Sequence, residues 1–245
     1  MKRIFITIFF LSLLINVFAQ NVSLDTLFII KPENENAIPS EVLKFPIIKT
    51  GNEKIDKLIN TDLKNRYTHN EYTKLSTEKA IKQWAYPVVY LDFEVTYLKN
   101  NIISLNISAE ACGANCGAWT EYFTYNTQTG KYITIDDVID LNSKLKLRII
   151  SEKDKQYEAQ KKELKSYITD SEIELDEDGY EWALNEYESC QKDFKIKTFA
   201  LHNGYLEIIE VCPLPNVIKY LSPTIELKYK FEEIYPYLKM KEIAK

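Results

Sequence analysis

The sequence predicts an α+β fold with mainly antiparallel strands and helices, arranged as two small lobes packed together. From Val88 onward, hydrophobic residues alternate with polar ones, which is typical of strands that bury one face. Asn203-Gly204 lies between two such runs and strongly indicates a β-hairpin. Other segments, above all 52–67 and 143–168, carry apolar residues at helical spacing. Helices and strands that occupy separate stretches of the chain favour the α+β class.

The first 19 residues have the pattern of a secretory signal peptide. Met1-Lys2-Arg3 is a short basic start, 4–15 is an apolar run, and Val17-Phe18-Ala19 suits a signal peptidase. The run is too short for an ordinary membrane span, and no later segment approaches ~18 uninterrupted apolar residues. We therefore expect cleavage after residue 19, export to the periplasm or the extracellular medium, and no transmembrane segment afterwards. A retained N-terminal anchor is the alternative.

Residues 20–87 are predicted to form an N-terminal lobe of strands and an amphipathic helix. The expected elements are strands at 22–30 and 42–48 and helices at 52–67 and 76–84. Asn52 and Ser76 are good N-caps for the two helices, and Pro87 ends the second.

Residues 88–245 are predicted to form the C-terminal lobe, which begins with a β-hairpin. Its alternation places odd-numbered residues of both strands on one apolar face, so odd residues must oppose odd residues. This register excludes a two-residue turn at Asn100-Asn101 and requires the three-residue loop 99–101. It also sets Glu110 opposite Tyr90.

Two more hairpins and several helices are expected in the C-terminal lobe. One hairpin covers 119–135, where Gly130 suits the left-handed position that closes a three-residue loop. The expected pairs in that hairpin are Tyr125 with Ile133 and Phe123 with Ile135. The other hairpin turns at Asn203-Gly204, and its expected pairs are Leu201 with Leu206, Phe199 with Ile208 and Lys197 with Glu210. The remaining elements are a turn at 136–137, helices at 143–168, 180–190 and 231–238, a short helix ending at 220, and a strand at 224–230.

The four cysteines are interpreted in the light of export, because an even number in an oxidising compartment usually forms disulfides. Four cysteines allow three pairings. We favour Cys112 with Cys116, a local pair, and Cys190 with Cys212, which links an expected helix end to an expected strand end. In the chain-entropy model the longer second loop is worth roughly 3 kcal/mol, and the first bridge mainly shapes a loop. A four-sulfur zinc site is the competing interpretation, although the spacing lacks paired Cys-x-x-Cys motifs.

The sequence lacks the motifs of the common catalytic machineries. His69 and His202 have no metal-ligand spacing and suit a solvated surface. No nucleophile elbow, phosphate loop, dinucleotide fingerprint or HExxH occurs, and the acidic run at 172–178 lacks the ligand order of an EF-hand. We therefore predict no catalytic residue, no metal and no cofactor, and favour a chain that is not an enzyme.

The charge of the chain limits its partners. Removing Lys2 and Arg3 with the signal peptide changes the formal net charge from −5 to about −7. Nucleic acids are bound chiefly through Lys and Arg, so an acidic chain is a poor candidate for that class of partner. A basic protein partner is electrostatically compatible.

The stretch 111–119 is the most specialised loop, since it holds two of the 4 cysteines and two of the 6 glycines. Polar residues of the adjacent strands lie next to it. The candidate binding residues are Tyr90, Glu94, Glu110, Asn115 and Trp119. Asp92, Glu94 and Glu110 share a polar face, and two carboxylates ~5 to 10 Å apart in a cleft would permit glycan hydrolysis. The plainer interpretation is the solvated face of an antiparallel sheet.

Two parts of the chain resemble a known extracytoplasmic domain. Phe45-Pro46-Ile47-Ile48 and the helix 52–67 look like the N-terminal lobe of a domain found in the anti-sigma factor RsiV and ahead of the peptidoglycan deacetylase PdaC. Residues 101–105, the Gly-Ala loop, 125–138 and the closing segment 225–238 resemble its C-terminal lobe. The resemblance implies a two-lobed domain, and RsiV-like domains bind lysozyme, a basic protein. Their loop typically reads Gly-Gly-Ala-His; no His is present here, so no role tied to it is carried over.

The chain is thus expected to be an exported, non-enzymatic binding module. Its cysteine loop and the adjacent polar sheet edge would contact a protein, such as a lysozyme, or a cell-wall glycan. The alternatives are a carboxylate-based glycan hydrolase and a structural envelope protein.

Overall fold

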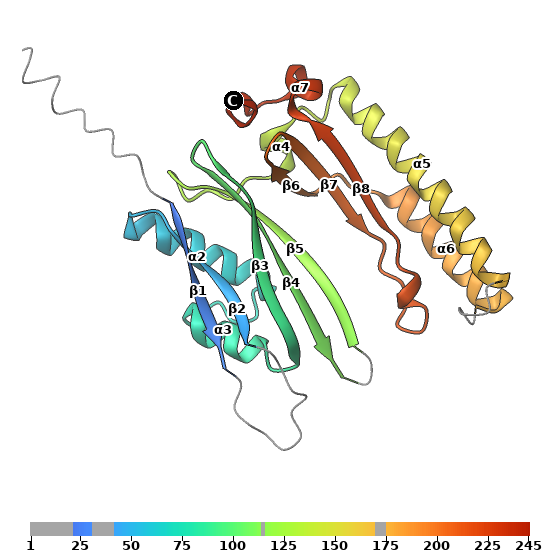
Figure 1. Ribbon diagram of the computed structural model, residues 1–245, viewed down its shortest axis with the longest axis horizontal. Coiled ribbons are helices and arrows are strands. Elements are labelled where there is room, and N and C mark those ends of the chain that lie inside the picture. The colour runs from blue at the N-terminus through green and yellow to red at the C-terminus, as the bar shows by residue number, and fades with distance from the viewer. Residues whose placement is uncertain (1–21, 31–41, 114–115, 170–174) are drawn as a thin grey trace, which may run out of the picture.

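The computed structural model describes residues 22–30, 42–113, 116–169 and 175–245. They form an α+β structure with three antiparallel sheets, which confirms the predicted class (Figure 1). The expected signal peptide and the candidate residue Asn115 lie outside the described part of the chain. Within that part, no helix combines the length and the apolar character needed to cross a membrane.

The first half of the molecule is a layer of strands covered by two helices on one face (Figure 1). Its elements are β1 (Ser23–Ile29), β2 (Leu43–Lys49), α2 (Glu53–Tyr67), α3 (Thr77–Trp84), β3 (Val88–Lys99), β4 (Ile102–Cys112) and β5 (Cys116–Asn126). β1 pairs with β2, β2 lies beside β3, and β4 is the central strand between β3 and β5. Both predicted N-caps are confirmed, because the Asn52 and Ser76 side chains accept backbone N–H groups of the first helical turns.

The core of this half lies between the sheet and its helices. The odd-numbered strand residues Leu91, Leu105 and Ile107 are buried there, as the alternation predicts. From the helix side they meet Ile59 and Tyr67 of α2.

The first hairpin corrects the predicted turn. Lys99 pairs with Ile102, so the turn is the two-residue Asn100-Asn101, with φ of 54° and 59°. Positive φ at both positions is the signature of a type I′ turn. The odd-with-odd register, with Tyr90 opposite Glu110, is nevertheless confirmed from Tyr90 to Val95, whereas Tyr97 pairs with Ser104. A bulge between Val95 and Tyr97 adds one unpaired residue to β3. This extra residue shifts the pairing by one position, so the strands can be joined by a turn of two residues in place of three.

The second expected hairpin, over 119–135, is wrong. β5 pairs with β4 along its whole length, and the chain then makes a turn with a single bridge between Tyr125 and Tyr132. Gly130 has the expected left-handed backbone, with φ of 77°. Ile135 begins a short helix, because Thr134 and Asp137 form a capping box that stops the strand.

The second half is a three-stranded sheet, in the order β6-β7-β8, packed against a long helix (Figure 1). Its elements are α4 (Ile135–Val138), α5 (Lys144–Ser166), α6 (Glu177–Asp193), β6 (Thr198–His202), β7 (Tyr205–Val211), β8 (Thr224–Lys230) and α7 (Phe231–Ile234), with 3₁₀ turns η1 (Tyr167–Thr169), η2 (Lys219–Leu221), η3 (Tyr235–Tyr237) and η4 (Lys241–Ala244). Leu201 opposite Leu206 and Phe199 opposite Ile208 are confirmed. Lys197 precedes β6, so its expected pair with Glu210 is not part of the ladder.

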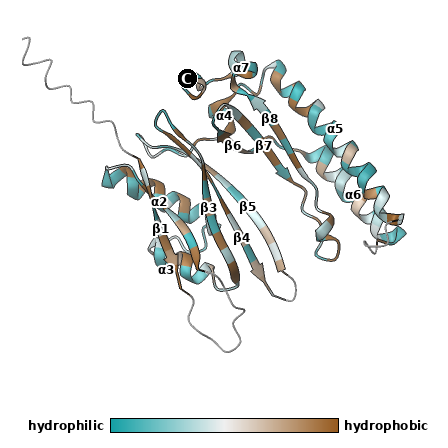
Figure 2. Ribbon diagram, viewed as in Figure 1, coloured by the Kyte–Doolittle hydropathy of each residue, from teal (hydrophilic) through white to brown (hydrophobic). Residues whose placement is uncertain are grey.

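Helix α5 covers both the apolar face and the outer edge of this sheet. Ile149 and Tyr157 pack on the buried residues of β6–β8, and Figure 2 shows both apolar and polar residues along the helix. The Gln156 side chain donates to the carbonyl of Glu226 in β8 at 2.7 Å and accepts the Glu226 N–H at 3.1 Å.

The two halves are joined where β6 contacts β3, β4 and β5. Ser104 of β4 is fully buried, and its Oγ accepts the Leu201 N–H at 3.1 Å and the Thr124 hydroxyl at 3.0 Å. Tyr97 and Ile102 belong to the core of the second half, whereas Ile103 belongs to the core of the first. The division of the chain into lobes at 87 and 88 stays a prediction.

Candidate functional site

The specialised loop is the end of the β4–β5 hairpin, which we call the cysteine hairpin (Cys112–Cys116). Cys112 and Cys116 are directly opposed in the ladder and joined by a disulfide. The loop therefore closes one hairpin and does not join two. A second disulfide links Cys190 in α6 to Cys212 after β7, so the structure has the pairing that the sequence favours.

A cleft of about 1030 Å³ lies against the cysteine hairpin, and we call it the cysteine cleft. The hairpin side contributes Pro87, Ala111, Cys112, Gly113, Cys116, Gly117, Ala118 and Trp119, and the opposite side contributes Asn216, Val217, Lys219 and Tyr220. Val217 and Tyr220 are 76% and 62% exposed. Among its described lining residues Lys219 alone is charged, and the cleft exposes polar groups as well as apolar and aromatic side chains.

Lys219 reaches across to the hairpin and contacts Gly117. A Cβ at position 117 would meet the Lys219 Nζ, which is the end of a flexible side chain and can move aside. Sequence reasoning missed Lys219 and Tyr220, because they lie about a hundred residues away from the loop in the chain.

Trp119 lies on the other face of β5 from the polar candidates. It pairs with Ala109 of β4 and packs edge-on against Trp84, with ring centroids 5.8 Å apart. It is partly buried against the core of the first half while also lining the cysteine cleft. Its position therefore combines a packing role with access to the cleft.

The polar candidates do not all gather at one place. Glu110 lies opposite Tyr90, and one of its carboxylate oxygens is within 4.8 Å of both cysteine sulfurs. Glu94 lies opposite Asn106, four residues farther along β4, which corresponds to about 13 Å of strand. This is the spacing of the two backbone positions, and the separation of the two carboxylates that the glycan hydrolase alternative requires stays a prediction.

Asp92, the third carboxylate of this face, forms an ion pair with Lys44 of β2 at 2.8 Å. In the described part of the chain, one cluster has the composition of a metal site: Glu110, Cys112 and Cys116. Both sulfurs are in the disulfide, which removes the thiolates that zinc would need.

The even-numbered face of the first sheet is less solvated than expected, because the second sheet faces part of it. Ser104 and Thr124 are buried there. Burial raises the pKa of Tyr122, and the negative charge of Glu207 across the interface raises it further.

His202 also differs from the solvated surface residue that was expected. Its Nε2 lies 2.8 Å from Glu207, its side chain is 22% exposed, and its ring stacks on Tyr205. Glu207 pairs with Lys228 as well, at 3.0 Å, and the hydrogen bonds to Glu207 and Glu226 raise the pKa of Lys228. His69, in contrast, is 69% exposed, as expected.

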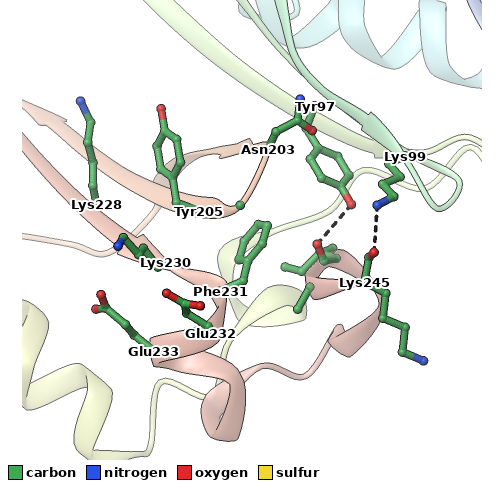
Figure 3. Close-up of a pocket in the computed structure, with 13 residues that line it drawn as sticks. Tyr97, Lys99, Asn203, Tyr205, Lys228, Lys230, Phe231, Glu232, Glu233 and Lys245 are labelled. Atoms are coloured by element: carbon green, nitrogen blue, oxygen red, sulfur yellow. Dashed lines mark hydrogen bonds between the residues drawn. The ribbon is translucent and has the colours of Figure 1, made fainter.

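A second cavity, of about 960 Å³, lies where the β3–β4 turn meets the β6–β7 turn and the 3₁₀ turn η4 (Figure 3). Lys99, Lys228 and Lys230 line it together with Tyr205 and Phe231. The Lys99 ammonium donates to the Lys245 carbonyl, and the Tyr97 hydroxyl to the Ile243 carbonyl (Figure 3). These contacts hold η4 against the β3–β4 hairpin, which gives this region a structural role.

No family model matches the sequence, and no curated protein matches it. Several solved structures resemble the fold, among them two of DUF3298 family proteins. One is a DUF3298 family member from Bacteroides fragilis, with a TM-score of 0.54 and 14% identity, covering 92% of this chain and 96% of that one. The other is a DUF3298 family protein from Pseudomonas aeruginosa PAO1, with a TM-score of 0.52 and 14% identity, covering 90% and 94%. The chain therefore shares the α+β fold of these DUF3298 family proteins.

Proposed function

We propose that this chain is an exported, non-enzymatic binding module that holds a protein ligand in the cysteine cleft. The observation that carries the proposal is the cleft itself, which places exposed Val217 and Tyr220 opposite a disulfide-closed hairpin. Concave sites lined by apolar and aromatic groups with a few polar ones are typical of ligand sites.

Export is supported by the N-terminal sequence pattern and by the two disulfides, which persist in oxidising compartments. The motif resemblance to the RsiV and PdaC extracytoplasmic domain points to the cell envelope as the place of action. A lysozyme is a fitting first probe, because it is basic and this chain is acidic. A cell-wall glycan is the second ligand class to test.

Isothermal titration of the exported form with lysozyme and with soluble peptidoglycan fragments tests the proposal. We expect binding by one of these probes and a loss of at least about tenfold in affinity for Val217→Ser. Leu147→Ser is the matched control, because Leu147 is a similarly exposed apolar residue on α5, away from the cleft. No heat with either probe at ~100 μM, which corresponds to weaker than about −5.5 kcal/mol, would count against these ligands. Equal loss in both variants would count against the cleft.

A further inference from the structure

The two disulfides have very different surroundings. Cys116 is exposed and Cys112 half-buried, and both line the cysteine cleft. Cys212 is fully buried in an apolar cluster with Leu164 and Tyr187, and Cys190 packs against the same cluster. A dissolved thiol can therefore reach the exposed Cys116 sulfur in the folded protein, whereas the second bridge offers only the half-buried Cys190.

Opening the first bridge requires little structural change. Ala111 and Gly117, the next residues along each strand, are themselves paired in the ladder, so the hairpin end is held without the sulfurs. In the chain-entropy model, a loop closed over 4 residues restricts the unfolded chain less than the Cys190–Cys212 loop, which is closed over 22. The native fold thus depends less on the exposed bridge.

One cation and one carboxylate lie near the exposed bridge. The Lys219 ammonium contacts Gly117, the residue next to Cys116, and a nearby cation stabilises a thiolate over a thiol. A Glu110 carboxylate oxygen lies within 4.8 Å of both sulfurs, and its negative charge acts against a thiolate there. Lys219 is therefore the charged group that favours thiol exchange at this bridge.

We propose that Cys112–Cys116 is an exchangeable disulfide that reacts with a dithiol of a partner protein in the cysteine cleft. A partner thiolate attacks the exposed Cys116 Sγ, the bond between the two sulfurs breaks, and Cys112 leaves as a thiolate that is then protonated. The second partner thiolate attacks the partner sulfur of the mixed disulfide and releases Cys116. The partner dithiol is oxidised to a disulfide, and two electrons and two protons end on Cys112 and Cys116. This activity goes beyond the proposed binding function and does not require non-covalent affinity.

The first test equilibrates the protein in glutathione buffers of decreasing redox ratio, followed by alkylation and peptide mass measurement. We expect Cys112 and Cys116 to become alkylated together at conditions at least ~10-fold less reducing than those needed for Cys190 and Cys212. Circular dichroism should show the native fold at that point. Reduction of both pairs together, or of Cys190–Cys212 first, would overturn the proposal. Because glutathione replaces the partner, this outcome is independent of the lysozyme and glycan titrations.

The second test examines Lys219 through the reactivity of Cys116 in a Cys112→Ser variant. The rate of alkylation by iodoacetamide, a neutral reagent, is measured against pH. Adding Lys219→Ala should shift the midpoint of this profile upward and slow the reaction at pH 7 by about 3-fold or more, since the thiolate loses its cation. Lys197→Ala, at another exposed lysine, is the control and should leave the profile unchanged. A profile that is the same with and without Lys219 would show that the cation plays no part in the exchange.

Discussion

Lys64 illustrates how one buried charged residue fixes a loop. Its side chain is almost fully buried, and the ammonium donates to the carbonyls of Tyr72, Thr73 and Leu75 at 3.1 to 3.2 Å. Burial lowers its pKa, because the charged form loses water. The three carbonyls replace that water and tie the segment after α2 to the helix.

Replacing this lysine should destabilise the first half. Lys64→Met keeps the apolar stem but leaves three carbonyls without their donor, so we expect a loss of about 2 kcal/mol or more in the free energy of unfolding. Urea unfolding followed by circular dichroism measures it. Lys57→Met, at an exposed position of the same helix, should change stability by less than about 0.5 kcal/mol. Equal effects would contradict the role of the three carbonyls.

Glu210 should make stability depend on pH. Its burial raises the pKa of its carboxyl to about 7, although the hydrogen bond from the Tyr157 hydroxyl and the Lys153 charge partly oppose this. The folded state binds the Glu210 proton more tightly than the unfolded state does. The contribution of this proton to the free energy of unfolding is therefore full below about pH 4.5 and is lost as pH rises through about 7.

Glu210→Gln should therefore flatten the pH profile between about 4.5 and 7. At pH 8 the variant should be more stable than the parent, by up to about 3 kcal/mol, because it needs no desolvated charge. Chemical unfolding at pH 4.5 and pH 8 gives the comparison. A variant that is less stable than the parent at pH 8 would show that the carboxylate is favourable there.

At the scale of helices and strands, the sequence predicts those features that depend on residues close together in the chain. The caps at Asn52 and Ser76, the alternation of β3 and β4, and the pairs around Asn203-Gly204 all rest on neighbours in sequence. The prediction for the turn at Asn100-Asn101 is wrong because one bulge near Thr96 changes the parity of the register. Nothing in the alternation itself indicates where an extra residue is tolerated.

The Ser104 hydroxyl group links β6 to the first sheet. Ser104→Ala removes the acceptor of the Leu201 N–H and the partner of Thr124, both buried, so we expect a loss of about 1 to 3 kcal/mol. Ser108→Ala is the control, because that hydroxyl meets Thr120 at an exposed position of the same strand. Thermal unfolding of the two variants should differ accordingly, and similar melting temperatures would refute the special role of Ser104.

At the scale of the whole molecule, contacts between distant segments are beyond the sequence. The cysteine pairing can be predicted from spacing and compartment, but the cleft needs Val217 and Lys219 from the other half. Glu94 shares a face with Glu110, and their positions in the sheet are four residues apart along β4. Proximity along one strand can be predicted, and proximity across two sheets cannot.

The lobe division can be tested by expressing residues 88–245 alone. In the whole chain α2 and α3 cover the apolar face of β3–β5, including Leu91, Leu105 and Ile107. Without them that face is exposed, so we expect aggregation or a loss of native circular dichroism. A soluble monomer with a cooperative melt would instead support an independent C-terminal lobe.

The contact of Gln156 with β8 affects how readily the protein aggregates at high concentration. A strand at the edge of a sheet offers its backbone to any other chain in extended form, which is how many proteins begin to aggregate. The amide of Gln156 occupies both backbone groups of Glu226 as a neighbouring strand would. One side chain thereby blocks the addition of a further strand at the middle of β8.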